Sequence, residues 1–188
     1  MFLVRIDIDG LGSVRHMLRG WSPPVQRRML RPAITKGSRR LASAVRREAP
    51  NETGLLRSSV GYFVKTYKNT GAVVGVVGPR KGFKKPVFLS SGRSVVLTPR
   101  NVAAYHHAAG RVVLRDPARY AKLVHDGTRP HTIVRRSGAV MAHPGAAPNR
   151  FVDRAVRSSW QAVSGIIVSE VKARLLATVR ARLLGQRR

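Results

Sequence analysis

The sequence contains no cysteine and no apolar segment long enough to cross a bilayer. The absence of cysteine excludes disulfide bonds and thiolate metal sites. A membrane-spanning helix needs about 18 or more mostly apolar residues in a row, and no such run occurs. The N-terminal segment, MFLVRIDIDG, lacks the basic and then apolar layout of a signal peptide and favours a strand. We therefore expect a soluble protein that is made in, or for, a cytoplasm.

Acidic residues are scarce. The chain has 36 Lys+Arg against 8 Asp+Glu, a formal net charge of +28. Most cationic side chains therefore cannot find an acidic partner in the same chain, and they repel one another unless an anion lies nearby. Nucleic acid is the commonest such partner. The alternative is an arginine-rich proteome that places arginine wherever lysine would serve.

The few acids also argue against catalysis, because no two of them form a convincing carboxylate pair for acid–base chemistry. The serines lie in turns or on helix faces, without a G-x-S-x-G elbow. The glycines never reach the spacing of a phosphate-binding or dinucleotide fingerprint before a helix. We expect no enzymatic activity and no cofactor.

Histidine offers the remaining route to a metal site, and five of the six histidines crowd one stretch of the chain. Metal sites need ligands at fixed spacing, usually with a carboxylate or thiolate. No H-E-x-x-H occurs, and the nearby acids are Asp116 and Asp126. Surface or interface histidines are the favoured interpretation, and no metal is expected. The crowded histidines are His106, His107, His125, His131 and His143.

Aromatic residues make up 6% of the chain and are not interleaved with the basic clusters. Stacking platforms for single-stranded nucleic acid need that interleaving. Any contact with nucleic acid should therefore be made through phosphates and be independent of sequence.

The length of 188 residues favours one domain over 1–188. Ser22 followed by Pro23 is typical of a helix start. Apolar residues then recur at helical spacing, but Pro32 lies inside the pattern. We expect a kink or two segments, the second over about Ala33 to Ala49. A second helix should begin at Asp116-Pro117 and end at Gly127.

Alternating and β-branched residues predict several short strands. The expected strands are Phe2–Asp9, a hairpin of Val60–Val64 with Ala72–Val77, a second hairpin about Ser91-Gly92, and a third of Thr132–Val134 with Ala139–Met141. The second hairpin lies in a segment, 80–100, that we expect to be an inserted, protruding arm. The segment Asn101–Leu114 fits a helix or a strand equally well.

The longest periodic segment predicts a C-terminal helix over 149–186, with apolar residues mostly four apart. Such a helix is long for a domain of this size, so part of its apolar face should meet another chain or the N-terminal helix. The expected fold class is α+β: a small antiparallel sheet packed with an N-terminal helix and a long C-terminal helix.

The segment EAPNETGLLRSSV, from Glu48 to Val60, marks the corner where the chain leaves a helix and enters a sheet. Pro50 forbids continuation of the helix. Gly54 suits a turn, and the hydroxyl of Thr53 can bond to local backbone N–H groups.

This corner and two later segments carry a resemblance. A helix ending in AP, followed by TG and by L-R-x-S-[IV], resembles the neck and tail-completion proteins of tailed bacteriophages, which include minor-tail-protein-Z-like tail components. RYAKLVHDGT, residues 119–128, is similar to the family's Y-A-x-x-V-E-x-G-T. HPGAAPNRFVDRA, residues 143–155, is similar to its HPG…P-x-P-F-L-x-x-A. The matches occur in the family's order and span most of the chain.

The resemblance implies an α+β fold and architectural roles for the matching residues. The residues that would fix the corner are Pro50, Thr53, Gly54, Leu55 and Arg57. Those that would form the central helix and its stop are Tyr120, Ala121, Val124, Gly127 and Thr128. Those that would seat the last helix are Pro148, Phe151 and Ala155. Two positions depart from the pattern. His125 replaces the usual Glu, which puts in doubt an ion pair at that spot, and Arg150 replaces a Pro, which loosens the approach to the last helix.

The implied function is that of a non-enzymatic virion protein at the head–tail junction, which completes or connects the tail. It would form a homo-oligomeric ring around the DNA conduit and contact a connector or stopper, a tail terminator or the tail tube. We expect one basic face, drawn from the 80–100 region or from the helices, to face the DNA. The candidates in that region are Arg80, Lys81, Lys84, Lys85, Arg93 and Arg100.

Alternatives remain open. The chain could be a cellular nucleic-acid-binding protein associated with the ribosome or nucleoid, or a tail-terminator or connector subunit. A membrane-surface role for the last helix is less favoured, because its aliphatic stripe is continuous with a plausible core.

Overall fold

The computed structural model describes residues 21–51, 54–68, 70, 72–84, 86–88, 94–96, 116–134 and 137–185. The expected strand at Phe2–Asp9 and the ambiguous segment Asn101–Leu114 lie outside these residues. The described chain has an α+β fold, with helices and three two-stranded sheets. Within these ranges, no helix combines the length and the apolar character needed to cross a membrane.

The chain folds into two compact units, each assembled from separate stretches of sequence. Of the described residues, unit 1 contains those within Val45–Val60 and Gly78–Ala155, and unit 2 contains those within 21–44, Gly61–Val77 and 156–185. This division was not predicted from the sequence. The long helices each contribute residues to both units, so neither unit corresponds to one continuous half of the chain.

Helix α2 (Pro23–Glu48) is one helix with Pro32 inside it, so of the two outcomes expected at Pro32 the division into two segments is wrong, and a kink stays a prediction. Proline at this position lacks the N–H that would bond to the carbonyl of Arg28. Arg28 lies on the exposed side of the helix, where water can hydrate that carbonyl. Met29 and Ala33, 3% and 0% exposed, hold the flanking turns in the core. Packing on the buried side therefore outweighs the local defect.

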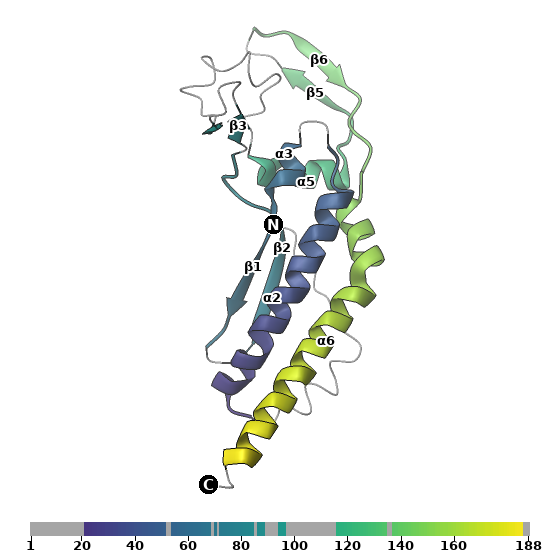
Figure 1. Ribbon diagram of the computed structural model, residues 1–188. Helices are drawn as coiled ribbons and strands as arrows, with labels where there is room; N and C mark the ends of the chain where they lie inside the picture. Colours follow the sequence, from purple (N-terminus) through teal and green to yellow (C-terminus); the bar gives the residue numbers. More distant parts are fainter. Residues whose placement is uncertain are drawn as a thin grey trace. The chain divides into compact units, whose positions relative to one another are not determined.

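In unit 2, α2 packs closely against two neighbours. A Cβ added at Gly37 would lie 2.7 Å from the side chain of Ile167, which belongs to helix α6 (Phe151–Gly185). A Cβ at Gly75 would lie 2.1 Å from the Ser38 hydroxyl oxygen, so strand β2 (Val73–Pro79) also approaches α2 closely. Figure 1 shows α2 beside α6 and beside the hairpin of β2 and β1 (Val60–Thr66). The core of this unit includes Ala33, Leu41, Ala44, Val163, Ile167 and Val171.

The described part of unit 1 contains two short helices and two hairpins. The helices are α3 (Leu55–Ser59) and α5 (Pro117–Asp126). The hairpins are antiparallel, and they pair β3 (Pro86–Phe88) with β4 (Ser94–Val96) and β5 (His131–Val134) with β6 (Val140–His143). All three predicted hairpins are confirmed, and α3 was not expected. Protrusion of the 80–100 segment as an arm stays a prediction.

The C-terminal helix α6 has 35 residues and closely matches the predicted 149–186. Its first turns belong to unit 1 and the rest to unit 2. In unit 1 its beginning is anchored by Phe151 and Ala155, both 0% exposed. The α+β class, with an N-terminal and a long C-terminal helix, is therefore as the sequence predicted.

Candidate functional site

The three motif segments meet in unit 1, and we call the place where they meet the motif junction: Ala49–Ser59 with α5, residues 127–128 and residues 143–155. α3 contacts α5. The backbone N–H of Thr128 donates to the carbonyl of Ala146 at 2.9 Å, and the reverse bond is 3.0 Å. Asn149 N–H donates to the Val124 carbonyl at 3.1 Å. Segments far apart in the sequence are thus joined through their backbones.

Arg57 ties the corner together. Its Nη2 donates to the carbonyls of Arg47 at 3.1 Å and Ala49 at 3.2 Å, and its Nε donates to Ala49 at 3.3 Å. These carbonyls lie at the C-terminal end of α2, where the last turn has no helical partners for its carbonyls. The planar guanidinium can serve two carbonyls at once, and a lysine ammonium has no such fork. Arg57 is therefore a side-chain cap for α2.

The rest of the corner is built from a left-handed turn and a buried pair. Gly54 precedes α3 with a φ of 67°, a region that glycine adopts without a steric penalty. Leu55 and Leu56 follow, 6% and 5% exposed. Pro50 ends the helical segment, as predicted. Thr53 lies outside the described residues.

Two further arginines cap carbonyls near the corner. Arg46 Nε donates to the carbonyl of Val60 at 2.9 Å. Arg80 donates to the Ser59 carbonyl through its backbone N–H at 3.0 Å and through Nε at 3.2 Å. The Arg80 guanidinium also lies over the ring of Phe83, 4.6 Å from its centroid. Because unit 1 has few acidic residues, these arginine side chains donate their hydrogen bonds to backbone carbonyls.

The start of α5 follows the predicted chemistry. The carboxylate of Asp116 accepts from the N–H of Ala118 at 3.0 Å and from the N–H of Gly82 at 3.0 Å. These backbone donors, Gly82 first, hold the pKa of Asp116 below its usual value, although burial opposes them. The capping residue therefore also fixes the basic loop that follows β2. Within α5, Ala121 is buried and Tyr120 is half-buried.

The end of α5 depends on two glycines. Gly127 has a φ of 76°, and a Cβ there would lie 2.5 Å from the carbonyl oxygen of Ala146. Gly145 has a φ of 86°, and its Cβ would lie 2.3 Å from the carbonyl oxygen of Thr128. Each glycine meets the segment that carries the other, so the two backbones can approach only without side chains at these positions.

The start of α6 is held by an unusual residue. Arg150 has a φ of 51° and is the only non-glycine residue with positive φ among those described. Its N–H donates to the carbonyl of His125 at 3.1 Å. Phe151 follows and meets the His125 ring edge-on, with centroids 5.6 Å apart. Pro148 is exposed and lies just before this turn.

His125 and Arg150, the two residues that depart from the pattern the chain resembles, come together in one charged cluster. His125, 5% exposed, places Nδ1 2.8 Å from Asp126 Oδ1 and Nε2 3.4 Å from Asp153 Oδ1. Arg150 Nη1 lies 3.7 Å from Asp126 Oδ1 and 4.0 Å from Asp153 Oδ2. Lys122 also pairs with Asp126. The Lys122 ammonium, followed by His125, lowers the pKa of Asp126 to about 2. A cluster of ionic side chains therefore lies at the position where His125, in place of the usual Glu, had put an ion pair in doubt.

The candidate DNA-facing residues are partly described. Arg80 is engaged with a backbone carbonyl and an aromatic ring, as above. Lys81 and Lys84 are exposed. Lys85, Arg93 and Arg100 lie outside the described residues.

Sequence reasoning missed the role of Asp153 and Arg154. Arg154 Nε lies 3.0 Å from Glu48 Oε2, and its Nη2 donates to the Asn149 side chain at 2.9 Å. Both residues lie on the first turns of α6, and nothing in their spacing indicates partners far away in the sequence. No group of three or more His, Asp or Glu side chains able to hold a metal ion occurs in the ranges the structure describes.

Comparison of the chain with models of protein families, with curated proteins and with solved structures gives no match.

Proposed function

We propose that this protein is a structural virion component at the head–tail junction of a tailed bacteriophage, where it completes the tail or connects it to the head. It assembles there as a ring around the DNA conduit, beside a connector or stopper, a tail terminator or the tail tube. It is made in the host cytoplasm and stays in the particle. Its motif residues act through packing and capping, not through catalysis.

One observation carries the proposal. The three segments that resemble the family lie far apart in the sequence, yet they meet at the motif junction. Their marker residues have interlocking architectural roles: Arg57 caps a helix, Gly127 permits a close backbone approach, and Phe151 fills the core. Unrelated short matches would have no reason to converge. Their convergence supports interpreting the three matches as one inherited unit.

The test is the composition of the particle. In a phage whose genome encodes this chain, mass spectrometry of purified particles should detect it, and electron microscopy should locate it between head and tail. Deleting its gene should leave filled heads and separate tails, and supplying the wild-type chain should restore joining. Particles that lack the chain, or normal joining without it, would refute the proposal.

The charge of the chain favours a second candidate, a cellular nucleic-acid-binding protein. A net charge of +28 is compatible with a ribosome- or nucleoid-associated role. This candidate predicts a monomer that binds nucleic acid tightly. The phage proposal, including its tail-terminator or connector variant, predicts a closed ring. Light scattering of the purified protein, with and without nucleic acid, separates the two.

A further inference from the structure

The charge excess is most one-sided in unit 2. Glu170 is the one acidic residue among the described residues of this unit. It already serves two cations: Lys36 Nζ lies 2.5 Å and Arg174 Nη2 lies 2.9 Å from its carboxylate. These partners, Lys36 first, lower its pKa. The other described cations of unit 2 therefore have no acidic partner within the described part of the unit.

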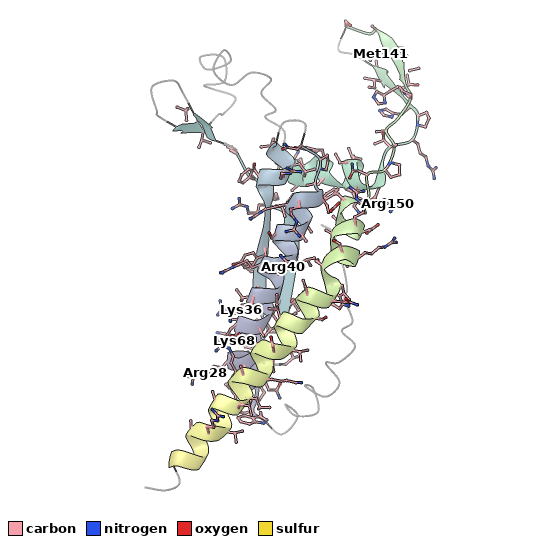
Figure 2. All side chains as sticks on the ribbon, turned by 45° about the vertical axis from the view of Figure 1, so that its right-hand side comes forward. Arg28, Lys36, Arg40, Lys68, Met141 and Arg150 are labelled. Atoms are coloured by element: carbon pink, nitrogen blue, oxygen red, sulfur yellow. The ribbon has the colours of Figure 1, made fainter. Side chains whose placement is uncertain are left out.

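Helix α2 carries some of these cations on the side opposite its packed face. Gly37 meets Ile167 of α6, and Ser38 meets Gly75 of β2. At about 100° per residue, Arg28, Lys36 and Arg39 project from the remaining arc, whereas Arg31 and Arg40 fall at angles flanked by buried positions. Figure 2 labels Arg28, Lys36 and Arg40 along this helix. The exposed basic residues of α2 in unit 2 are Arg28, Arg31, Lys36, Arg39 and Arg40.

Tyr62 of strand β1 and the turn after the strand lie near this side. Arg39 reaches the Tyr62 hydroxyl with Nε and Nη2, both at 3.4 Å. Arg27 donates to the backbone carbonyl of Lys68, so the turn lies near the N-terminal half of α2. Lys68 is exposed. Lys65 is also exposed, but its odd spacing from Tyr62 places it on the other face of the hairpin. We call Arg28, Arg39 and Lys68 the α2–β1 cationic face.

We propose that the α2–β1 cationic face binds the phosphate backbone of duplex DNA. The inference deepens the proposed function and rests on it, because the proposed function identifies the polyanion as genomic DNA. From Arg28 to Arg39 the helix rises about 17 Å at about 1.5 Å per residue. That is the length of roughly five base pairs at about 3.4 Å each. Several phosphates can therefore lie against the face at once.

Charge complementarity selects this occupant. A second copy of the chain would bring the same cationic face and would be repelled. An anionic membrane surface would need an apolar face to insert, but the apolar side of α2 is already buried, with Ala33 at 0% and Ala44 at 1% exposed. The exposed Phe63 adjoins Tyr62 in strand β1 and therefore points to the other face of the hairpin. Contacts from flexible arginine and lysine side chains to phosphates carry no sequence information. The face should thus bind any duplex.

The test compares two triple variants of the full chain that remove the same charge. Arg28→Gln/Arg39→Gln/Lys68→Gln neutralises the three residues of the face. Arg157→Gln/Lys172→Gln/Arg180→Gln neutralises three exposed residues of α6, also in unit 2. Glutamine is nearly as good a helix former as arginine or lysine, so both variants should fold. Binding to a random-sequence duplex is measured by fluorescence anisotropy across about 50 to 200 mM salt.

Each phosphate contact contributes about 0.9 to the slope of log K against log salt. The face variant should therefore lose about 2.7 of that slope and about 10²-fold in affinity near 0.1 M salt. The α6 variant should keep the wild-type slope. Equal losses in both variants, or no loss in the face variant, would overturn the assignment. If the face variant fails to fold, Arg28→Gln/Lys68→Gln takes its place, with an expected slope loss of about 1.8.

A parallel measurement with anionic phosphatidylserine vesicles addresses the other polyanionic surface. A face variant that loses vesicle binding but retains DNA binding would also overturn the assignment. Failure of this binding assignment can be distinguished from failure of the proposed function. Particle composition decides whether the protein is a virion component, and the paired variants decide whether this face binds DNA.

Discussion

Replacing Arg57 by methionine keeps most of the aliphatic length of the side chain but removes its three hydrogen bonds to the carbonyls of Arg47 and Ala49. A hydrogen bond to a charged donor contributes about 1.5–3 kcal/mol when its partner is buried. Arg47 is exposed, so water can replace the donor at its carbonyl. Ala49 is 1% exposed, and its carbonyl loses two bonds at once. We expect the free energy of unfolding to fall by about 2–3 kcal/mol.

The assay is urea unfolding followed by far-ultraviolet circular dichroism, with hydrogen exchange to localise the loss to the end of α2. Arg57→Lys should fall between the wild type and Arg57→Met, because an ammonium keeps the charge but lacks the planar fork. Arg119→Met is the matched control: this arginine is exposed on α5, and its loss should change stability by less than about 0.5 kcal/mol. If Arg57→Met is no more destabilising than Arg119→Met, the capping role of this residue is wrong.

Two further predictions concern the motif junction. Gly127→Ala should lower the free energy of unfolding by about 1–3 kcal/mol more than Gly138→Ala: both glycines have positive φ, but only at Gly127 would a Cβ meet backbone, 2.5 Å from the Ala146 carbonyl oxygen. Equal urea midpoints would contradict this. Asp126 has its pKa lowered to about 2, mainly by Lys122, so its contribution to stability is present above about pH 4 and is lost as the pH falls through about 2. Asp126→Asn should therefore reduce the change of the melting temperature with pH between about pH 5 and 2. An unchanged pH dependence would argue against the ion cluster.

Local signals made α5 predictable. Asp116 and Pro117 start this helix and Gly127 stops it, each through chemistry that acts within a few residues. The hairpins were equally predictable, because the alternating strand residues and the turn residues lie close together in the sequence. The long C-terminal helix was predicted from its period alone.

Tertiary packing decided the features that were missed. α3 is one short turn, too short to show a period, and it depends on a left-handed Gly54 and the burial of two leucines. α2 continues through Pro32 because buried residues on either side hold it. The charged cluster joins His125 to Asp153 across two turns and a hairpin, a distance that no local pattern spans. The sequence showed basic clusters, but not that unit 2 would retain so few acids.

The interleaving of the two units has a practical consequence for anyone who wishes to dissect this molecule genetically. Because the described residues of unit 2 come from three separate stretches and those of unit 1 from the two stretches between them, a stop codon or a protease nick between Val45 and Ala155 leaves both bodies incomplete. Expression of separate halves should therefore yield aggregated or degraded fragments. Dissection has to proceed by point substitutions, or by co-expressing complementary fragments that can reassemble.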